Sequence, residues 1–190
     1  MTYLLLGIAL FLGVHSVRIF AEGFRTRTIA RIGPLAWKGL YSVVSLAGFV
    51  LLVWGYSMTR GEAGLWNPPG WTRHATALLM LVSFILLAAA YVPGNGIKAR
   101  VGHPMVLSVK VWALAHLLSN GRLGDVLLFG AFLLWAILDF KAARGRDKAA
   151  GTSYPSLGAA RTGIAVTLGL VAYLVFMLWL HTLLIGVRPF

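Results

Sequence analysis

The sequence predicts an all-α fold, a polytopic membrane helical bundle of about six transmembrane helices that forms one domain over residues 1–190. Three observations predict it. Hydrophobic residues make up 59% of the chain and charged residues 12%, about half the charged share of soluble domains. The apolar residues gather in runs long enough to cross a bilayer, and mean hydropathy is +0.82. The charged residues lie mostly between those runs.

A membrane-crossing helix needs about 20 predominantly apolar residues. Five runs meet or approach that length: Tyr3–Phe20, Gly39–Met58, His74–Val92, Pro104–Gly121 and Gly163–Ile185. The sixth run, Val126–Leu138, is shorter because Asp125 and Asp139 bound it. A buried or re-entrant helix is therefore an alternative for this run.

The charge distribution predicts the orientation of these helices. Lys and Arg number 17 against five Asp and Glu, a net charge of +12. With six spans, the loops that follow the first, third and fifth spans hold most of the basic residues, so the positive-inside rule places both termini outside the cytoplasm. In a soluble chain this charge would suggest nucleic acid. Here we expect no nucleic acid, and contact with membrane lipids instead.

Histidines are the candidate ligands, because the chain has no cysteine and so no thiolate or iron–sulfur chemistry. His15, Arg18 and Glu22 fall on one helical stripe at i, i+3 and i+7. One interpretation is an Arg18–Glu22 ion pair beside a satisfied histidine. The other is a ligand histidine, with Arg18 holding an acidic group of a cofactor.

The run Pro104–Gly121 carries more polar candidates than any other. His103 precedes the helix and either caps it or lines a site, and Lys110 is the one basic residue deep in a predicted span. Trp112 and His116 are one turn apart. A histidine in mid-helix needs a partner inside the bundle, so His116 is a candidate ligand with His15.

Two segments carry a resemblance to a known family. The segment 103–121, with its Lys-x-Trp-Ala-Leu-Ala-His core, and the segment 129–139 resemble the signature of the NnrU family. The amino-terminal His15-Ser-x-Arg18 also fits, so the resemblance covers essentially the whole chain. The family is similar to the ζ-carotene isomerases, which are haem-b membrane enzymes.

The resemblance implies a haem b cofactor in a multi-pass protein of the bacterial inner membrane. It implies His15 and His116 as axial ligands of the iron and Arg18 as the partner of a propionate. His103, Lys110 and Trp112 would line the same pocket. The implied roles are a function linked to nitrite and nitric oxide reduction, with nitric oxide as ligand, or haem-dependent cis–trans isomerisation of a hydrophobic polyene.

Two other function classes stay open. One is a membrane assembly or regulatory factor without haem, which would contact a protein partner through its basic loops. The other is an isoprenylcysteine-type methyltransferase that uses S-adenosylmethionine. Arg100 and His103-Pro resemble the Arg-His-Pro element of those enzymes, but no glutamate follows Glu62 to supply their Glu-Glu pair.

Overall fold

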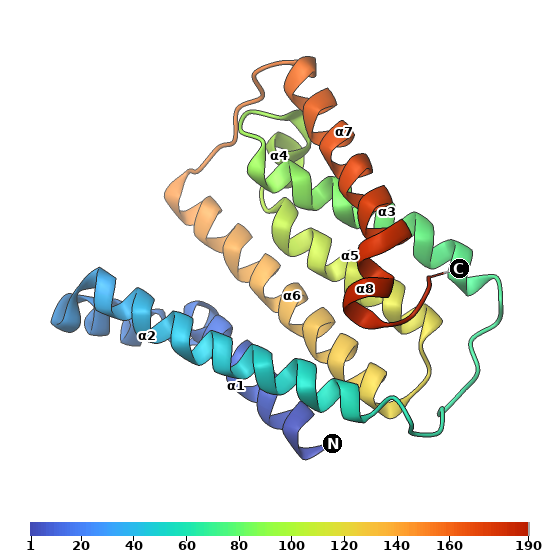
Figure 1. The fold of residues 1–190 in the computed structure, drawn as a ribbon. Helices are drawn as coiled ribbons and strands as arrows, with labels where there is room; N and C mark the ends of the chain where they lie inside the picture. Colours follow the sequence, from blue (N-terminus) through green and yellow to red (C-terminus); the bar gives the residue numbers. More distant parts are fainter. Residues whose placement is uncertain (190) are drawn as a thin grey trace. The chain divides into compact units, whose positions relative to one another are not determined.

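A computed structural model describes residues 1–189 of the chain as a succession of helices (Figure 1). In chain order they are α1 (Thr2–Phe20), α2 (Glu22–Met58), α3 (Thr72–Tyr91), α4 (Gly96–Val101), α5 (Pro104–Ser119), α6 (Leu123–Ala150), α7 (Ala159–Val175), the π-helical turn η1 (Phe176–Leu180) and α8 (His181–Ile185). Within this range β structure is limited to an isolated bridge between Gly64 and Arg122. The all-α prediction is confirmed.

Five helical segments are long and apolar enough to cross a membrane, and α5, with 16 residues, is a shorter apolar helix. The segments are α1, α2, α3, α6 and the continuous stretch Ala159–Ile185. Together with α5 they agree with the approximate count of six. The run Val126–Leu138 is part of a longer helix than expected, because α6 begins at Leu123 and continues past Asp139 to Ala150. Its length supports a membrane span over the alternative of a short buried or re-entrant helix. Its Ala-rich extension contains good helix formers, so the charged residues there continue the helix.

The chain divides into two compact units. The first holds residues 1–67 and 120–139, and the second holds residues 68–119 and the chain from Phe140 onward. Helix α6 contributes its first part to the first unit and the remainder to the second.

In the first unit, α1 and α2 pack as a close antiparallel pair through glycines. A Cβ atom at Gly7 would collide with the backbone of Leu52, and one at Gly55 would collide with the backbone of Leu4. Small residues allow helix backbones to approach closely in membrane proteins. The side chains of Leu4 and Leu52 are buried where the two helices meet.

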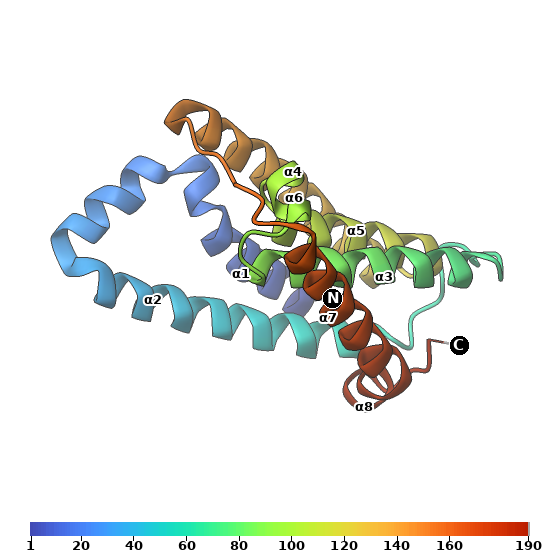
Figure 2. The same cartoon turned by 90° about the horizontal axis from the view of Figure 1, so that it is seen from above.

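The segment expected as a basic loop between the first two spans is helical. Helix α2 begins at Glu22 and bends at Gly33, which has φ 83° and is followed by Pro34 (Figure 2). Proline offers no backbone N–H to the preceding turn, and glycine tolerates positive φ, so the pair produces a bend within the helix.

The second unit is built on α3, which packs against α5 and α7. Hydroxyl groups of α3 bond to carbonyls of α5: Thr76 donates to Ala115 at 2.8 Å and Ser83 donates to Ser108 at 2.9 Å. On α7, Gly169 approaches the backbone of Ile85. These contacts satisfy polar groups inside apolar helices, as a membrane interior requires.

Candidate functional site

The expected stripe of His15, Arg18 and Glu22 is interrupted. Helix α1 ends at Phe20, and Ala21 has the non-helical angles φ −136° and ψ 41°. Glu22 therefore belongs to α2, where its carboxylate pairs with Arg25 at 2.7 Å. The predicted Arg18–Glu22 pair is wrong. His15 and Arg18 remain one turn apart on α1.

The imidazole of His15 is held by its own helix. Its Nδ1 lies 2.6 Å from the carbonyl oxygen of Phe11, one turn earlier. A carbonyl can only accept, so Nδ1 carries the proton, and in the neutral ring the lone pair is on Nε2. No hydrogen-bond partner for Nε2 exists among residues 1–189. This arrangement is typical of metal-ligating histidines, whose second nitrogen donates to a backbone carbonyl or carboxylate.

Three aromatic rings of the first unit surround the His15 ring. Phe11 lies 4.3 Å from it between centroids, Tyr41 meets it edge-on at 5.2 Å, and Trp135 meets it edge-on at 6.1 Å. They come from α1, α2 and α6 respectively. Packing on several sides restricts the rotation of the imidazole, as a fixed ligand position requires.

His15 lines a cavity of about 320 Å³ between α1 and α2. The lining is aromatic and apolar on one part and hydroxylic on the other: Phe11, His15, Tyr41, Ser42, Ser45, Leu46 and Phe49.

Two buried polar atoms beside this cavity have no hydrogen-bond partner within residues 1–189, Oγ of Ser45 and Nε1 of Trp135. The Ser45 hydroxyl lies near the Tyr41 hydroxyl, but the two groups do not have the distance and angles of a hydrogen bond. Each such group costs about 1–3 kcal/mol when buried unpaired. Ser45 lines the cavity and could bond with a ligand there, whereas Trp135 packs on His15 without lining the cavity.

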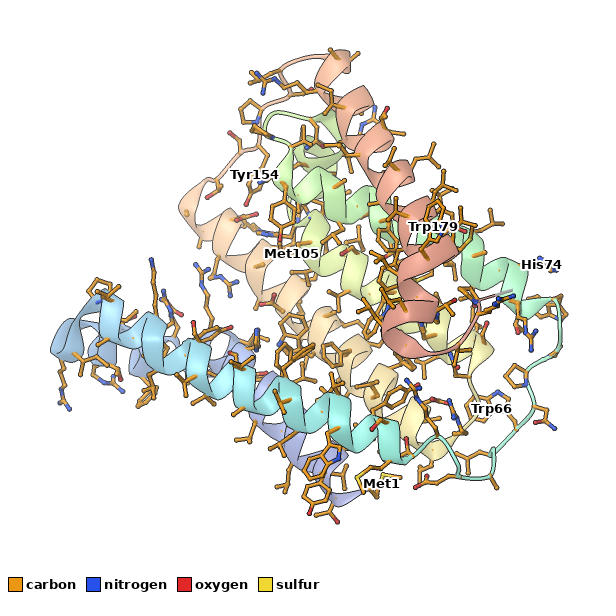
Figure 3. All side chains as sticks on the ribbon, viewed as in Figure 1. Met1, Trp66, His74, Met105, Tyr154 and Trp179 are labelled. Atoms are coloured by element: carbon orange, nitrogen blue, oxygen red, sulfur yellow. The ribbon has the colours of Figure 1, made fainter. Side chains whose placement is uncertain are left out.

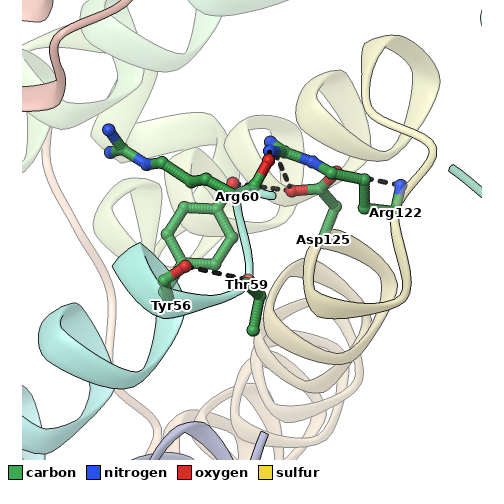
Figure 4. Close-up of polar contacts among 5 residues, drawn as sticks. All are labelled: Tyr56, Thr59, Arg60, Arg122 and Asp125. Atoms are coloured by element: carbon green, nitrogen blue, oxygen red, sulfur yellow. Dashed lines mark hydrogen bonds and ion pairs between the residues drawn. The ribbon is translucent and has the colours of Figure 1, made fainter. Parts of the chain in front are cut away.

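A second polar cluster of the first unit lies where α2 ends and α6 begins (Figure 4). Asp125, only 1% exposed, accepts hydrogen bonds from the Tyr56 hydroxyl at 2.7 Å and from Nε and the backbone N–H of Arg122 at 3.0 Å. Arg122 also donates to the carbonyl of Arg60 at 2.9 Å. A carboxylate in the first helical turn that reaches back to the preceding N–H is half of a capping box.

The Asp125 cluster is paired throughout. Burial lowers the pKa of Arg122, but hydrogen bonding and attraction to Asp125 outweigh that effect and raise it. Next to this cluster, the backbone N–H of Leu65 in the α2–α3 loop donates a hydrogen bond to the carbonyl oxygen of Gly121, just before α6, at 2.7 Å. Because its groups satisfy one another, the cluster acts as a clamp between the α2–α3 loop and α6.

In the second unit, His116 repeats the geometry of His15. Its Nδ1 donates to the carbonyl oxygen of Trp112 at 2.9 Å, and the two rings lie 5.4 Å apart. The neutral ring again carries its lone pair on Nε2. The prediction that Trp112 and His116 share a helix face is confirmed.

His103 is arranged differently. Its Nε2 pairs with Oδ2 of Asp147 at 2.8 Å, and Oδ1 of the same carboxylate accepts from the Tyr154 hydroxyl at 3.2 Å. Tyr154, labelled in Figure 3, follows the end of α6. Burial first, and then the bond to Asp147, raise the pKa of Tyr154.

Lys110 lies close to the His103 cluster. Its Nζ is 4.9 Å from the centre of the Phe140 ring, and that ring also meets His103 edge-on at 6.3 Å. The structure thus brings His103 and Lys110 together, both within the second unit. His15 and Arg18 belong to the first unit, and Trp112 and His116 to the second.

Sequence reasoning missed Tyr41, Ser45 and the Asp125 clamp as features of the site. Tyr41 and Ser45 lie one turn apart in a largely apolar run that also contains Ser42, which is a signal that could have found them. The partnership of Tyr56 with Asp125 spans 69 positions and leaves no local trace. No group of three or more His, Asp or Glu side chains with metal-site geometry occurs within residues 1–189.

The apolar helices, and a histidine that lines a cavity within one of them, place the chain in the class of multi-pass helical membrane proteins with an ionisable group inside a span. Within it, residues 3–189 match the model of the family described as NnrU protein. That match covers nearly the whole chain, so the protein belongs to the NnrU family. Searches of curated proteins and of solved structures found no match.

Proposed function

We propose that this NnrU family protein binds haem b, and that Nε2 of His15 would hold its iron. The observation that carries the proposal is the state of the His15 cavity. Its histidine is held through Nδ1, which leaves Nε2 as the nitrogen that a neutral ring offers to a ligand, and two buried polar groups beside the histidine lack hydrogen-bond partners within residues 1–189.

The residues around His15 fit such a cofactor. A porphyrin supplies most of the ligands of its own iron and needs only one or two from the protein, which suits isolated histidines in a chain without cysteine. Phe11, Leu46 and Phe49 offer an apolar surface to a flat macrocycle. The cavity is open on one side, so its lining does not shut out a group larger than the cavity itself.

His116 is the preferred second ligand. Its Nδ1 lies 2.9 Å from the carbonyl oxygen of Trp112, one turn earlier, as Nδ1 of His15 does with Phe11. Arg18, one turn beyond His15, is the proposed partner of a propionate, because a guanidinium matches the geometry of a carboxylate. Lys110, Trp112 and His103 are proposed as pocket residues from the family resemblance.

Bound haem supplies an iron that can hold nitric oxide or act on a polyene. The chain's own residues would fix the ring of His15, keep water from the apolar side of the cavity and hold the propionate. We place this activity in the bacterial inner membrane, with both termini outside the cytoplasm, and in nitrite and nitric oxide reduction or in haem-dependent isomerisation.

An absorption spectrum of the detergent-purified protein, with and without dithionite, tests the proposal. We expect a Soret band and haem b by the pyridine haemochrome assay, both lost in His15→Ala. His181→Ala is the matched control, because His181 also bonds through Nδ1 to a carbonyl but does not line the cavity.

Colourless protein that does not take up added haem would overturn the proposal. Haem content that is equal in the wild type and in His15→Ala would overturn the assignment of the ligand. The first result would favour the alternative of a haem-free assembly or regulatory factor.

A further inference from the structure

A second cavity, of about 520 Å³, lies in the second unit between α4 and α7, which are neighbours in Figure 1. Small and apolar residues form most of its lining, with one arginine and two threonines among them: Gly96, Ile97, Arg100, Ala159, Thr162, Gly163, Val166 and Thr167. None of these residues belongs to the proposed haem site.

Arg100 is the basic residue among those that line this cavity. Neighbouring cations are engaged, since Lys98 donates to the Ala90 carbonyl at 3.5 Å and Arg161 donates to the Pro93 carbonyl at 3.3 Å. The side chain of Arg100 makes no hydrogen bond or ion pair with any of residues 1–189. Its exposed guanidinium is thus open to a planar or tetrahedral anion.

Thr162 adds a hydroxyl donor to the same cavity. Its Oγ1 accepts a hydrogen bond from the backbone N–H of Gly96 at 2.8 Å. The hydroxyl proton remains for another acceptor, because a threonine hydroxyl both accepts and donates. A guanidinium and a hydroxyl in one lining match the oxygens of a phosphate group.

The surrounding charge favours an anion. The second unit holds ten Lys and Arg residues and a single carboxylate, Asp147. That carboxylate is already bound to His103 and Tyr154. No acidic side chain lines the cavity, so nothing in its lining opposes a negative ligand.

The apolar part of the lining identifies the kind of anion. Gly163 and Val166 continue the cavity along α7, within the apolar stretch Ala159–Ile185 that is able to cross a membrane, and Ile97 of α4 adds to the apolar lining. A ligand that joins a phosphate group to an apolar chain would contact both the polar and the apolar part of the lining. We infer that this cavity binds the headgroup of an anionic phospholipid, with Arg100 and Thr162 on the phosphate and an acyl chain along α7.

Native mass spectrometry of the full-length protein tests this inference. Protein in non-ionic detergent is mixed with equal amounts of dioleoylphosphatidylglycerol and dioleoylphosphatidylcholine, and the bound lipids are counted. We expect a retained phosphatidylglycerol whose preference over phosphatidylcholine falls about fivefold in Arg100→Gln, the loss of one basic contact. Arg31→Gln removes an exposed charge outside the cavity and should keep the preference.

A second variant tests the cavity itself. A Cβ atom at Gly163 would meet no atom within 4 Å, so the backbone there accepts a side chain, and Gly163→Leu should occupy part of the cavity and reduce lipid binding. Gly145→Leu is its matched control, since Gly145 is also unobstructed but does not line the cavity.

An unchanged lipid preference in Arg100→Gln, or equal binding of the two lipids by the wild type, would overturn the inference. Displacement of phosphatidylglycerol by millimolar inorganic phosphate would also overturn it, because the site would then belong to a soluble anion. If Gly163→Leu did not fold, Arg100→Gln would decide alone. Haem content plays no part in this readout, so the two proposals fail separately.

Discussion

The first unit contains two polar clusters that differ in whether their buried polar groups have hydrogen-bond partners. Around Asp125 the polar groups bond to one another, and the buried carboxylate is held by Tyr56 and Arg122. Around His15 two buried groups, on Ser45 and Trp135, have no partner in the described chain. A paired cluster stabilises the fold by itself, whereas an unpaired one lowers stability until a ligand completes it. The difference separates a structural clamp from a binding site.

The largest effect is expected at the clamp. Asp125→Ala should lower the free energy of unfolding by about 2–3 kcal/mol, because it leaves the half-buried side chains of Arg122 and Tyr56 without their shared acceptor. Denaturant titration in detergent micelles measures this value. Glu62→Ala, which removes an exposed carboxylate from the adjoining loop, is the control. A loss below about 1 kcal/mol would show that Asp125 is not the centre of the clamp.

The cavity should respond with the opposite sign. Ser45→Ala removes a buried hydroxyl without a partner, so the ligand-free protein should become more stable by about 1 kcal/mol. Ser83→Ala is the matched comparison, because its hydroxyl is bonded to the Ser108 carbonyl and its loss should destabilise the protein. Equal losses in both variants would mean that the Ser45 hydroxyl is already satisfied in the apoprotein.

A milder change at the clamp tests how much each hydrogen bond to Asp125 contributes to the free energy of unfolding. Tyr56→Phe removes one donor to Asp125 and leaves those of Arg122 in place, so we expect a loss of about 1 kcal/mol. The same denaturant titration applies. A loss as large as that of Asp125→Ala would indicate that Tyr56, and not Arg122, holds the carboxylate.

The smallest effect concerns the paired carboxylate of the second unit. The pKa of Tyr154 is raised above its unfolded value of about 10, first by burial and then by Asp147. Its contribution to stability is therefore complete below pH 10 and is lost as the pH rises through the folded-state pKa. Melting temperatures between pH 8 and 11 should fall less steeply in Tyr154→Phe than in the wild type.

Tyr91→Phe is the control for this pH dependence, because Tyr91 is 71% exposed. A wild-type slope that Tyr154→Phe leaves unchanged would contradict the assigned role of the hydroxyl.

The sequence predicts the parts of the fold that depend on local composition. Apolar runs of bilayer length locate the membrane helices, and their approximate number follows. The extension of α6 and the helical course of the chain on both sides of Gly33 were not predicted, since charged residues and a Gly-Pro pair are both typical of loops.

The candidate site could be predicted only in part. His15 and His116 stand out because an ionisable side chain in an apolar run needs a reason. In both residues Nδ1 bonds to the backbone carbonyl four residues earlier, and any α-helix brings a carbonyl to that position. The partners of Asp125 and the unsatisfied state of Ser45 and Trp135 depend on contacts between distant segments, which the sequence does not encode locally.

Rescue of a His15→Gly variant with imidazole tests the central claim most directly. Haem is titrated into the purified variant, with and without imidazole, and uptake is followed by the Soret band. We expect the variant to bind haem only when imidazole replaces the missing side chain, because the cavity and its unpaired donors remain. Haem uptake that is independent of imidazole and equal to that of the wild type would contradict the assignment of His15 as the ligand.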